Sequence, residues 1–192
     1  YRTADEYGRL AYELSKDPKL KEIEIDKLGL QKLLDSREGA IEAVNYGIRS
    51  QYNYETADGN NKCSFTLTPK KLKQLLNECR TPDDIDMKSL EILVAKDNAT
   101  LTGRDISLDG KWFRETYITP EDDGTFYRIE LTQDYIKRQS EQYMSADPAF
   151  KALARILVRQ NIGIKIIYRG DKSGKTVEIV FTPEELNTLI NK

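Results

Sequence analysis

The sequence predicts an α+β fold in which antiparallel β-hairpins pack against helices. Some segments alternate polar with apolar residues or are rich in β-branched and aromatic residues, which is typical of strands. Other segments place apolar residues three and four positions apart, which is typical of amphipathic helices. Both kinds of segment recur in a similar order along the chain. We therefore expect a duplicated unit of strand, helix, helix, strand, strand and helix.

The first recurring element is a strand that leads directly into a helix. The strand residues are followed by Asp or Thr, whose side-chain oxygen can accept a hydrogen bond from the free N–H groups of a helix start. Pro69 and Pro183 then occupy the first helical position, where the missing N–H is not needed. The four predicted strand ends are residues 23–26, 65–68, 129–132 and 179–182.

The second recurring element is a helix that ends near a glycine and leads into a strand. Residues 37–46 and 148–161 are the two predicted helices, followed by Gly47 and Gly163. We expect both glycines to adopt positive φ, as is common at helix ends. The strands that follow continue to a polar turn, at residues 58–61 in one copy and 170–174 in the other.

The repeat divides the chain into two α+β units joined near residues 80–86. The first unit, 1–80, includes an N-terminal helix with its apolar face up to Leu14. The second and larger unit covers 81–192. Its first segment, behind Asp86, favours a helix over a strand. Residues 111–118 and 125–131 predict a hairpin across an acidic turn. The alternative to two units is one continuous sheet through both.

The composition excludes several classes of chemistry. The 192 residues contain no histidine and two cysteines, which excludes Ser-His-Asp and Cys-His catalysis, His-ligated metal and a four-Cys zinc site. We expect no cofactor and no metal site. With 30 basic and 32 acidic residues, the chain lacks the basic balance of a nucleic-acid binder. No apolar run approaches the length of about 20 residues that a membrane span needs. Cys63 and Cys79 could be bonded or free.

Two polar segments resemble ligand sites only superficially. Residues 170–176 have the glycines and Lys-Thr of a phosphate loop, but the spacing is one residue short and a strand follows instead of a helix. Residues 121–124 gather three carboxylates, but such residues beside glycine are ordinary turn chemistry and lack the calcium-loop spacing. No spacing singles out a catalytic pair among the 32 acids.

Aromatic residues on the predicted strands are the best candidates for a recognition surface. The sequence contains eleven tyrosines and one tryptophan. Exposed aromatic side chains can stack on sugars or anchor a protein partner, although aromatic residues also fill strands simply because they pack well there. Alternation places Phe113 with Tyr117 on one face, and Tyr52 with Tyr54 on another. The candidate surface residues are Tyr52, Tyr54, Trp112, Phe113, Tyr117 and Tyr127.

A pattern of helix, aromatic-rich hairpin and terminal strand runs through residues 96–98, 106–108, 112–131, 150–153, 163–168 and 177–183. With this pattern, the second half of the chain resembles an uncharacterised family of small exported bacterial α+β domains of unknown function. The resemblance covers about 85–192 and includes no catalytic signature. It implies an extracytoplasmic location, in the periplasm or at the cell surface, possible lipid anchoring, and an export signal removed before Tyr1.

These observations favour a non-catalytic binding or assembly module of the bacterial cell envelope, with a protein or a glycan as partner. Two alternatives stay open. One is a hydrolase that uses two carboxylates in a cleft between the units, which requires acids with separated pKa values in one pocket. The other is a carrier of a small apolar ligand held between sheet and helices.

Overall fold

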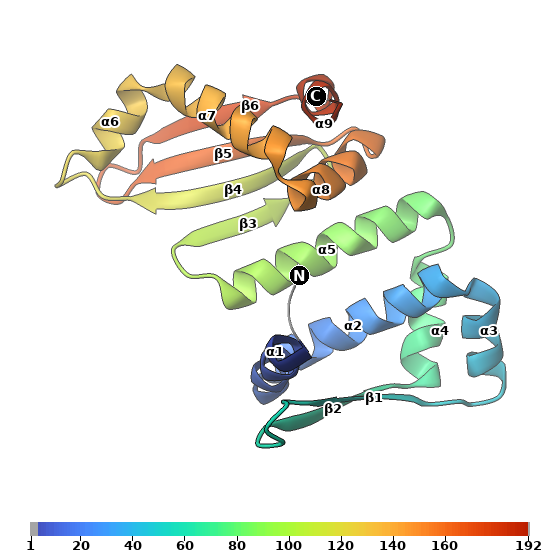
Figure 1. Cartoon of the computed structure of the whole chain (residues 1–192). Helices are drawn as coiled ribbons and strands as arrows, with labels where there is room; N and C mark the ends of the chain where they lie inside the picture. Colours follow the sequence, from blue (N-terminus) through green and yellow to red (C-terminus); the bar gives the residue numbers. More distant parts are fainter. Residues whose placement is uncertain (1–3, 192) are drawn as a thin grey trace. The chain divides into compact units, whose positions relative to one another are not determined.

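The computed structural model describes residues 4–191 and divides the chain into two compact units, Tyr1–Ala99 and Thr100–Lys192, called unit 1 and unit 2 here (Figure 1). The α+β fold with antiparallel hairpins is confirmed. The strands form two separate sheets, so the alternative of one continuous sheet is wrong. The division falls at the last residue of the long helix that starts near the expected join at 80–86.

Unit 1 combines helices with one two-stranded antiparallel sheet. The strand pair β1–β2 lies against α1 and α2, and its register places Tyr52 opposite Phe65. Leu72 and Leu75 of α4 are buried in the core with Leu67 of β2. The elements are α1 (Ala4–Lys16), α2 (Pro18–Asp35), α3 (Arg37–Asn45), β1 (Ser50–Glu55), β2 (Lys62–Leu67), α4 (Pro69–Glu78) and α5 (Pro82–Thr100).

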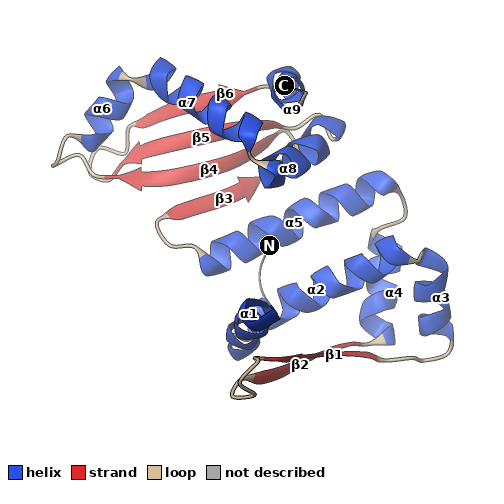
Figure 2. Cartoon of the chain, viewed as in Figure 1, coloured by secondary structure: helices blue, strands red, loops and turns tan. Residues whose placement is uncertain are grey.

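Unit 2 is a four-stranded sheet in the order β3-β4-β5-β6, with helices packed on one face (Figure 2). The outer pairs are antiparallel, whereas β4 and β5 run parallel. Parallel neighbours cannot be joined by a tight turn, and here three helices make the crossover. The elements are β3 (Arg104–Leu108), β4 (Trp112–Thr119), α6 (Thr125–Leu131), α7 (Gln133–Ala146), α8 (Pro148–Arg159), β5 (Gly163–Gly170), β6 (Thr176–Phe181) and α9 (Pro183–Ile190).

Two of the four predicted strand-to-helix elements are confirmed. Thr68 and Thr182 end strands and accept hydrogen bonds from the backbone N–H groups of Lys71 and Glu185. At α9 the side chain of Glu185 also accepts from the Thr182 N–H at 2.8 Å, which completes a capping box. The sequence signal was therefore reliable where a strand met a Thr-Pro pair.

The other two predicted strands, 23–26 and 129–132, are wrong. Residues 23–26 lie inside α2, which begins earlier, where the Asp17 carboxylate accepts from the Lys19 N–H at 2.8 Å. The alternation there covers only a few residues of an 18-residue helix. The strand that should open the first copy of the repeat is therefore helical.

The predicted hairpin of 111–118 with 125–131 is also wrong in its second half. Residues 125–131 form α6, and Asp123 accepts from the Thr125 N–H at 2.8 Å where the helix begins. Phe126 is buried and Ile129 half-buried, three positions apart, while Tyr127 is exposed. Helical spacing of the buried residues outweighed the β-propensity of this aromatic-rich segment.

The expected role of the two helix-ending glycines holds for one of them. Gly47 has φ of 67°, as expected. In the second copy the positive φ falls on Asn161, at 54°, whereas Gly163 lies in β5 with ordinary backbone angles. Gly163 is needed for a different reason. A Cβ atom there would meet the Trp112 ring and the Phe181 carbonyl oxygen.

Candidate functional site

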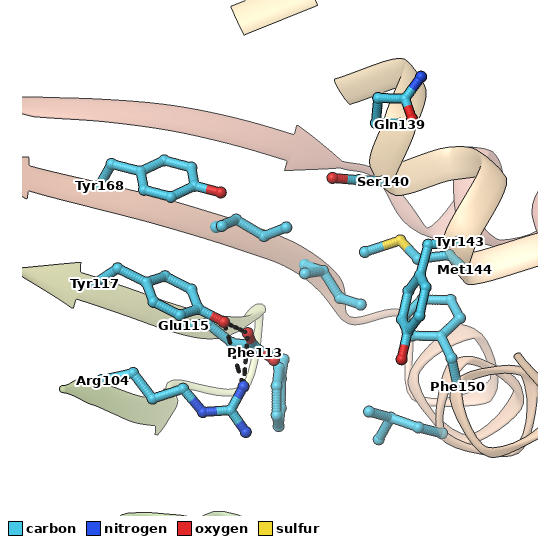
Figure 3. Close-up of a pocket in the computed structure, with 13 residues that line it drawn as sticks. Arg104, Phe113, Glu115, Tyr117, Gln139, Ser140, Tyr143, Met144, Phe150 and Tyr168 are labelled. Carbon is cyan, nitrogen blue, oxygen red and sulfur yellow. Dashed lines mark hydrogen bonds and ion pairs between the residues drawn. The ribbon is translucent and has the colours of Figure 1, made fainter. Parts of the chain in front are cut away.

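A cavity lies in unit 2, between the sheet and helices α7 and α8 (Figure 3). It has a volume of about 430 Å³. Cavities of this size accommodate small organic molecules. The lining residues are Arg104, Phe113, Glu115, Tyr117, Gln139, Ser140, Tyr143, Met144, Phe150, Leu153, Ile164, Ile166 and Tyr168.

Strand alternation and register bring the sheet residues of this cavity together. Phe113, Glu115 and Tyr117 alternate along β4, so their side chains share one face. The antiparallel neighbour places Arg104 opposite Tyr117, and the parallel neighbour places Tyr168 opposite the same residue. Three strands thus contribute side chains to one site.

One part of the cavity is apolar. Phe113 and Ile164 are buried side chains of the sheet, with 1% and 3% of their surface exposed. Met144 of α7 and Phe150 of α8 lie across the cavity from the sheet (Figure 3), and Leu153 of α8 also lines it. The sheet and the two helices therefore supply a surface suited to a hydrocarbon or an aromatic ring.

The other part of the cavity holds a compact polar network. The Arg104 guanidinium lies 3.4 Å from the Glu115 carboxylate. The Tyr117 hydroxyl donates to Glu115 at 2.8 Å and accepts from Arg104 at 3.2 Å. Its ring stacks on that of Tyr168, with 5.6 Å between the ring centroids. The ion pair and the Tyr117 hydroxyl are thus joined through short polar contacts.

The hydroxyl groups of both stacked tyrosines are uncharged at physiological pH. Burial is the main reason that the pKa of Tyr117 is raised above its ordinary value. Burial, followed by the negative charge of Glu115, raises the pKa of Tyr168. Each phenol therefore keeps its proton and can donate it to a hydrogen bond.

Two hydroxyl groups of the cavity differ from that network. Within residues 4–191, the hydroxyls of Tyr168 and Ser140 have no hydrogen-bond partner. In Figure 3 they point toward one another from β5 and from α7. Each can donate and accept a hydrogen bond. The cavity thus presents two polar groups from opposite walls with their bonding capacity intact.

The sequence-predicted surface residues do not form one surface. Phe113 and Tyr117 line the cavity, and Phe113 is buried rather than exposed. Trp112 lies on the opposite face of the sheet, where the Lys165 ammonium is 4.8 Å from the centroid of its ring. Tyr127 is 49% exposed on α6.

The two predicted tyrosines of unit 1 share a strand face, as alternation indicated. Tyr52 packs against the buried core of unit 1 and is half-buried. Tyr54 is half-buried too and contacts Phe65 edge to face, with the ring centroids 5.6 Å apart. Much of the surface of both rings is therefore used for packing.

Sequence reasoning missed most of the cavity wall. Arg104, Ser140 and Tyr168 come from three separate elements, and no local pattern links them. A weak signal existed for Tyr168, which alternates with the buried Ile164 and Ile166. Only the parallel pairing of β4 with β5 puts Tyr168 beside Tyr117.

The phosphate-loop-like segment and the acidic turn bind each other. The Glu121 carboxylate accepts from the backbone N–H groups of Lys172 and Ser173 at 2.9 and 2.7 Å. Hydrogen bonds from Ser173 are the largest cause of a lowered pKa at Glu121. In return, Asp171 accepts from the Glu121 N–H at 3.1 Å. The turn between β5 and β6 thus holds an anion, and that anion is a side chain of unit 2.

The structure also bears on the two cysteines, on metal binding and on membrane crossing. Cys63 and Cys79 are free thiols. Within residues 4–191, no cluster of three or more Cys, Asp or Glu side chains is arranged to hold a metal ion. In the same part of the chain, no helix combines the length and apolar character that crossing a bilayer requires.

Comparison with known proteins gave no relative. The sequence matches no protein-family model and no curated protein, and the structure matches no solved structure. Any function of the chain must therefore be inferred from the geometry of the cavity.

Proposed function

We propose that unit 2 is a non-catalytic binding module that takes a small amphipathic ligand into the cavity between its sheet and helices α7 and α8. One observation carries this proposal: a cavity of about 430 Å³ has apolar walls in one part and convergent polar groups in another. Ligand sites in proteins are usually concave and mostly apolar, with a few placed polar groups that orient the ligand. This form of binding corresponds to the apolar-ligand alternative considered from the sequence.

The composition of the cavity favours binding over hydrolysis. Two-carboxylate hydrolysis needs a general acid and a second carboxylate on either side of the scissile bond. Among the described residues that line the cavity, Glu115 is the single carboxylate. Its Oε2 atom already interacts with Tyr117 and Arg104. The site can hold a ligand but does not offer a pair of acids to cleave one.

The resemblance of residues 85–192 to exported domains supports a further proposal, an extracytoplasmic location. We also propose a protein or a glycan as the partner that binds the exposed aromatic residues. Immunodetection of the protein in separated cell fractions tests the location, and a pull-down from envelope extract tests the partner.

Blocking the cavity tests the proposed function. N-phenyl-1-naphthylamine, an uncharged probe whose fluorescence rises in apolar sites, should bind the full chain saturably. Leu153→Trp places a large ring in the cavity and should abolish the binding. Leu131→Trp is the matched control, because Leu131 is 84% exposed on α6 and should leave the binding unchanged.

Folding of each variant is checked by circular dichroism and thermal unfolding before titration. If Leu153→Trp does not fold, Leu153→Phe provides a smaller obstruction at the same position and should weaken binding of the probe. Equal probe affinity in the folded Leu153 variant and the wild type would overturn the proposal. So would the absence of saturable binding to the wild type.

A further inference from the structure

We infer that the ligand of this cavity carries an uncharged head group, such as a hydroxyl or an amide, on its apolar body. The inference rests on the proposed function and specifies the chemistry of the ligand. It is drawn from the balance of charge in the polar part of the cavity and from the two hydroxyls that remain available there.

The charges that line the cavity balance each other. Among the described lining residues, Arg104 and Glu115 alone carry charge, and they lie 3.4 Å apart. Both are half-buried, so water screens an added charge less here than at an open surface. A carboxylate head attracted by Arg104 would also come close to the like charge of Glu115. An ammonium head attracted by Glu115 would come close to the like charge of Arg104. Either head is opposed by one member of the pair, whereas a neutral head is opposed by neither.

Part of the bonding capacity of the pair is engaged internally, through the Oε2 atom of Glu115. Tyr117 bridges the two charges, since it donates to Glu115 and accepts from Arg104. A charged head that binds one member of the pair competes with the other member for it. Removing one partner of a desolvated pair leaves the other charge uncompensated, which is strongly unfavourable.

The Tyr168 and Ser140 hydroxyls provide the complementary groups. They converge from opposite walls of the cavity (Figure 3). A ligand hydroxyl can donate to one of them and accept from the other, and an amide can do the same through its N–H and C=O groups. The apolar body then extends among Phe113, Met144 and Phe150. Charge balance and hydrogen bonding therefore select the same class of head group.

A matched series of probes tests this inference on the full chain. Octanol, octanoate and octylammonium share one alkyl chain and differ in the charge of the head. Each is titrated near neutral pH as a competitor of N-phenyl-1-naphthylamine, below the concentration at which it forms aggregates. We expect octanol to bind about tenfold more tightly than either charged analogue, a difference that corresponds to about 1.4 kcal/mol.

The two levels of the proposal fail in different ways. If octanoate or octylammonium binds as tightly as octanol, the inference on the head group is overturned while the cavity remains a binding site. If the naphthylamine probe itself shows no saturable binding, the proposed function is overturned. Probe binding with no competition from octanol also overturns the inference.

Single hydroxyl deletions locate the head group. Tyr168→Phe keeps the ring that stacks on Tyr117 and should weaken octanol binding about fivefold, the effect of one lost hydrogen bond. Ser140→Ala should act in the same direction. Tyr135→Phe is the control, because Tyr135 is 58% exposed on α7 and is not among the residues that line the cavity. The naphthylamine probe has one N–H donor and no hydroxyl, so its affinity should fall less than that of octanol in Tyr168→Phe and Ser140→Ala. Unchanged octanol affinity in Tyr168→Phe and Ser140→Ala would overturn the assignment.

Discussion

Replacement of Gly163 by alanine should destabilise unit 2 even though the backbone there suits any residue. A Cβ atom at this position would lie 2.8 Å from the Phe181 carbonyl oxygen and 2.9 Å from Cε3 of Trp112. Both distances are shorter than real Cβ atoms show. The ring of Trp112 can turn aside, but the carbonyl belongs to the neighbouring strand β6. Strand β5 must therefore shift, and the parallel pairing of β4 with β5 is strained.

The expected magnitude follows from two opposing effects. Overpacking of a well-filled site costs about 1–3 kcal/mol. The alanine also restricts the unfolded chain, which returns about 0.4–1 kcal/mol. We expect Gly163→Ala to lower the free energy of unfolding by about 1–2 kcal/mol. Removing the ring in a Trp112→Ala background should reduce this loss by at least about 0.5 kcal/mol, because part of the clash disappears.

Urea denaturation is the assay. Trp112 is the only tryptophan of the chain, so its fluorescence reports on the unfolding of unit 2 in the single variant. Circular dichroism replaces it in the Trp112→Ala background. Asn161→Gly is the control, since φ at Asn161 is 54° and glycine adopts positive φ freely. A loss below about 0.5 kcal/mol in Gly163→Ala, within the usual effect of a neutral surface substitution, would refute the steric reasoning.

Three further predictions concern a turn, a cap and the thiols. Glu121→Gln should destabilise unit 2 at neutral pH. Because the pKa of Glu121 is lowered in the folded protein, the advantage of the wild type should shrink as acidification passes through that pKa, which urea midpoints at several pH values would show. Thr182→Ala removes the acceptor of the α9 cap and should cost about 1 kcal/mol in urea unfolding, whereas Thr182→Ser should be nearly neutral. Burial raises the pKa of Cys63 and Cys79, so Ellman's reagent should modify Cys79 in particular far more slowly before unfolding than after it, and fast reaction of Cys79 in the native protein would contradict its burial.

Local patterns predicted the elements that carry strong capping or turn chemistry. Thr68 and Thr182 marked strand-to-helix junctions because Thr accepts from a helix start and the following proline needs no donor there. The polar segments at 58–61 and 170–174 lie in the turns of hairpins β1–β2 and β5–β6. These signals act within a few residues, so the rest of the chain did not alter them.

Two segments with strand-like composition were decided by their wider context. Residues 125–131 have strand-like composition, but Phe126 is buried in a helix because β4 pairs with a parallel partner and the chain must cross over the sheet. Residues 23–26 alternate like a strand but continue a helix already capped at Asp17. Intrinsic propensity differs between the alternatives by about 1 kcal/mol or less per residue, which tertiary burial readily exceeds.

The same distinction between local patterns and tertiary contacts applies to the candidate site. The amino-acid sequence by itself determined the α+β class, the strongest caps and turns, and the placement of Phe113 and Tyr117 on one strand face, because these depend on alternation and on hydrogen bonds between near neighbours. Only the tertiary structure decided that Tyr168 lies beside Tyr117 and that the Ser140 hydroxyl points toward that of Tyr168 from α7. It also decided that a cavity remains between the sheet and the helices. Strand order, parallel pairing and the fit of helices on a sheet depend on contacts between distant residues, and no local pattern encodes such contacts.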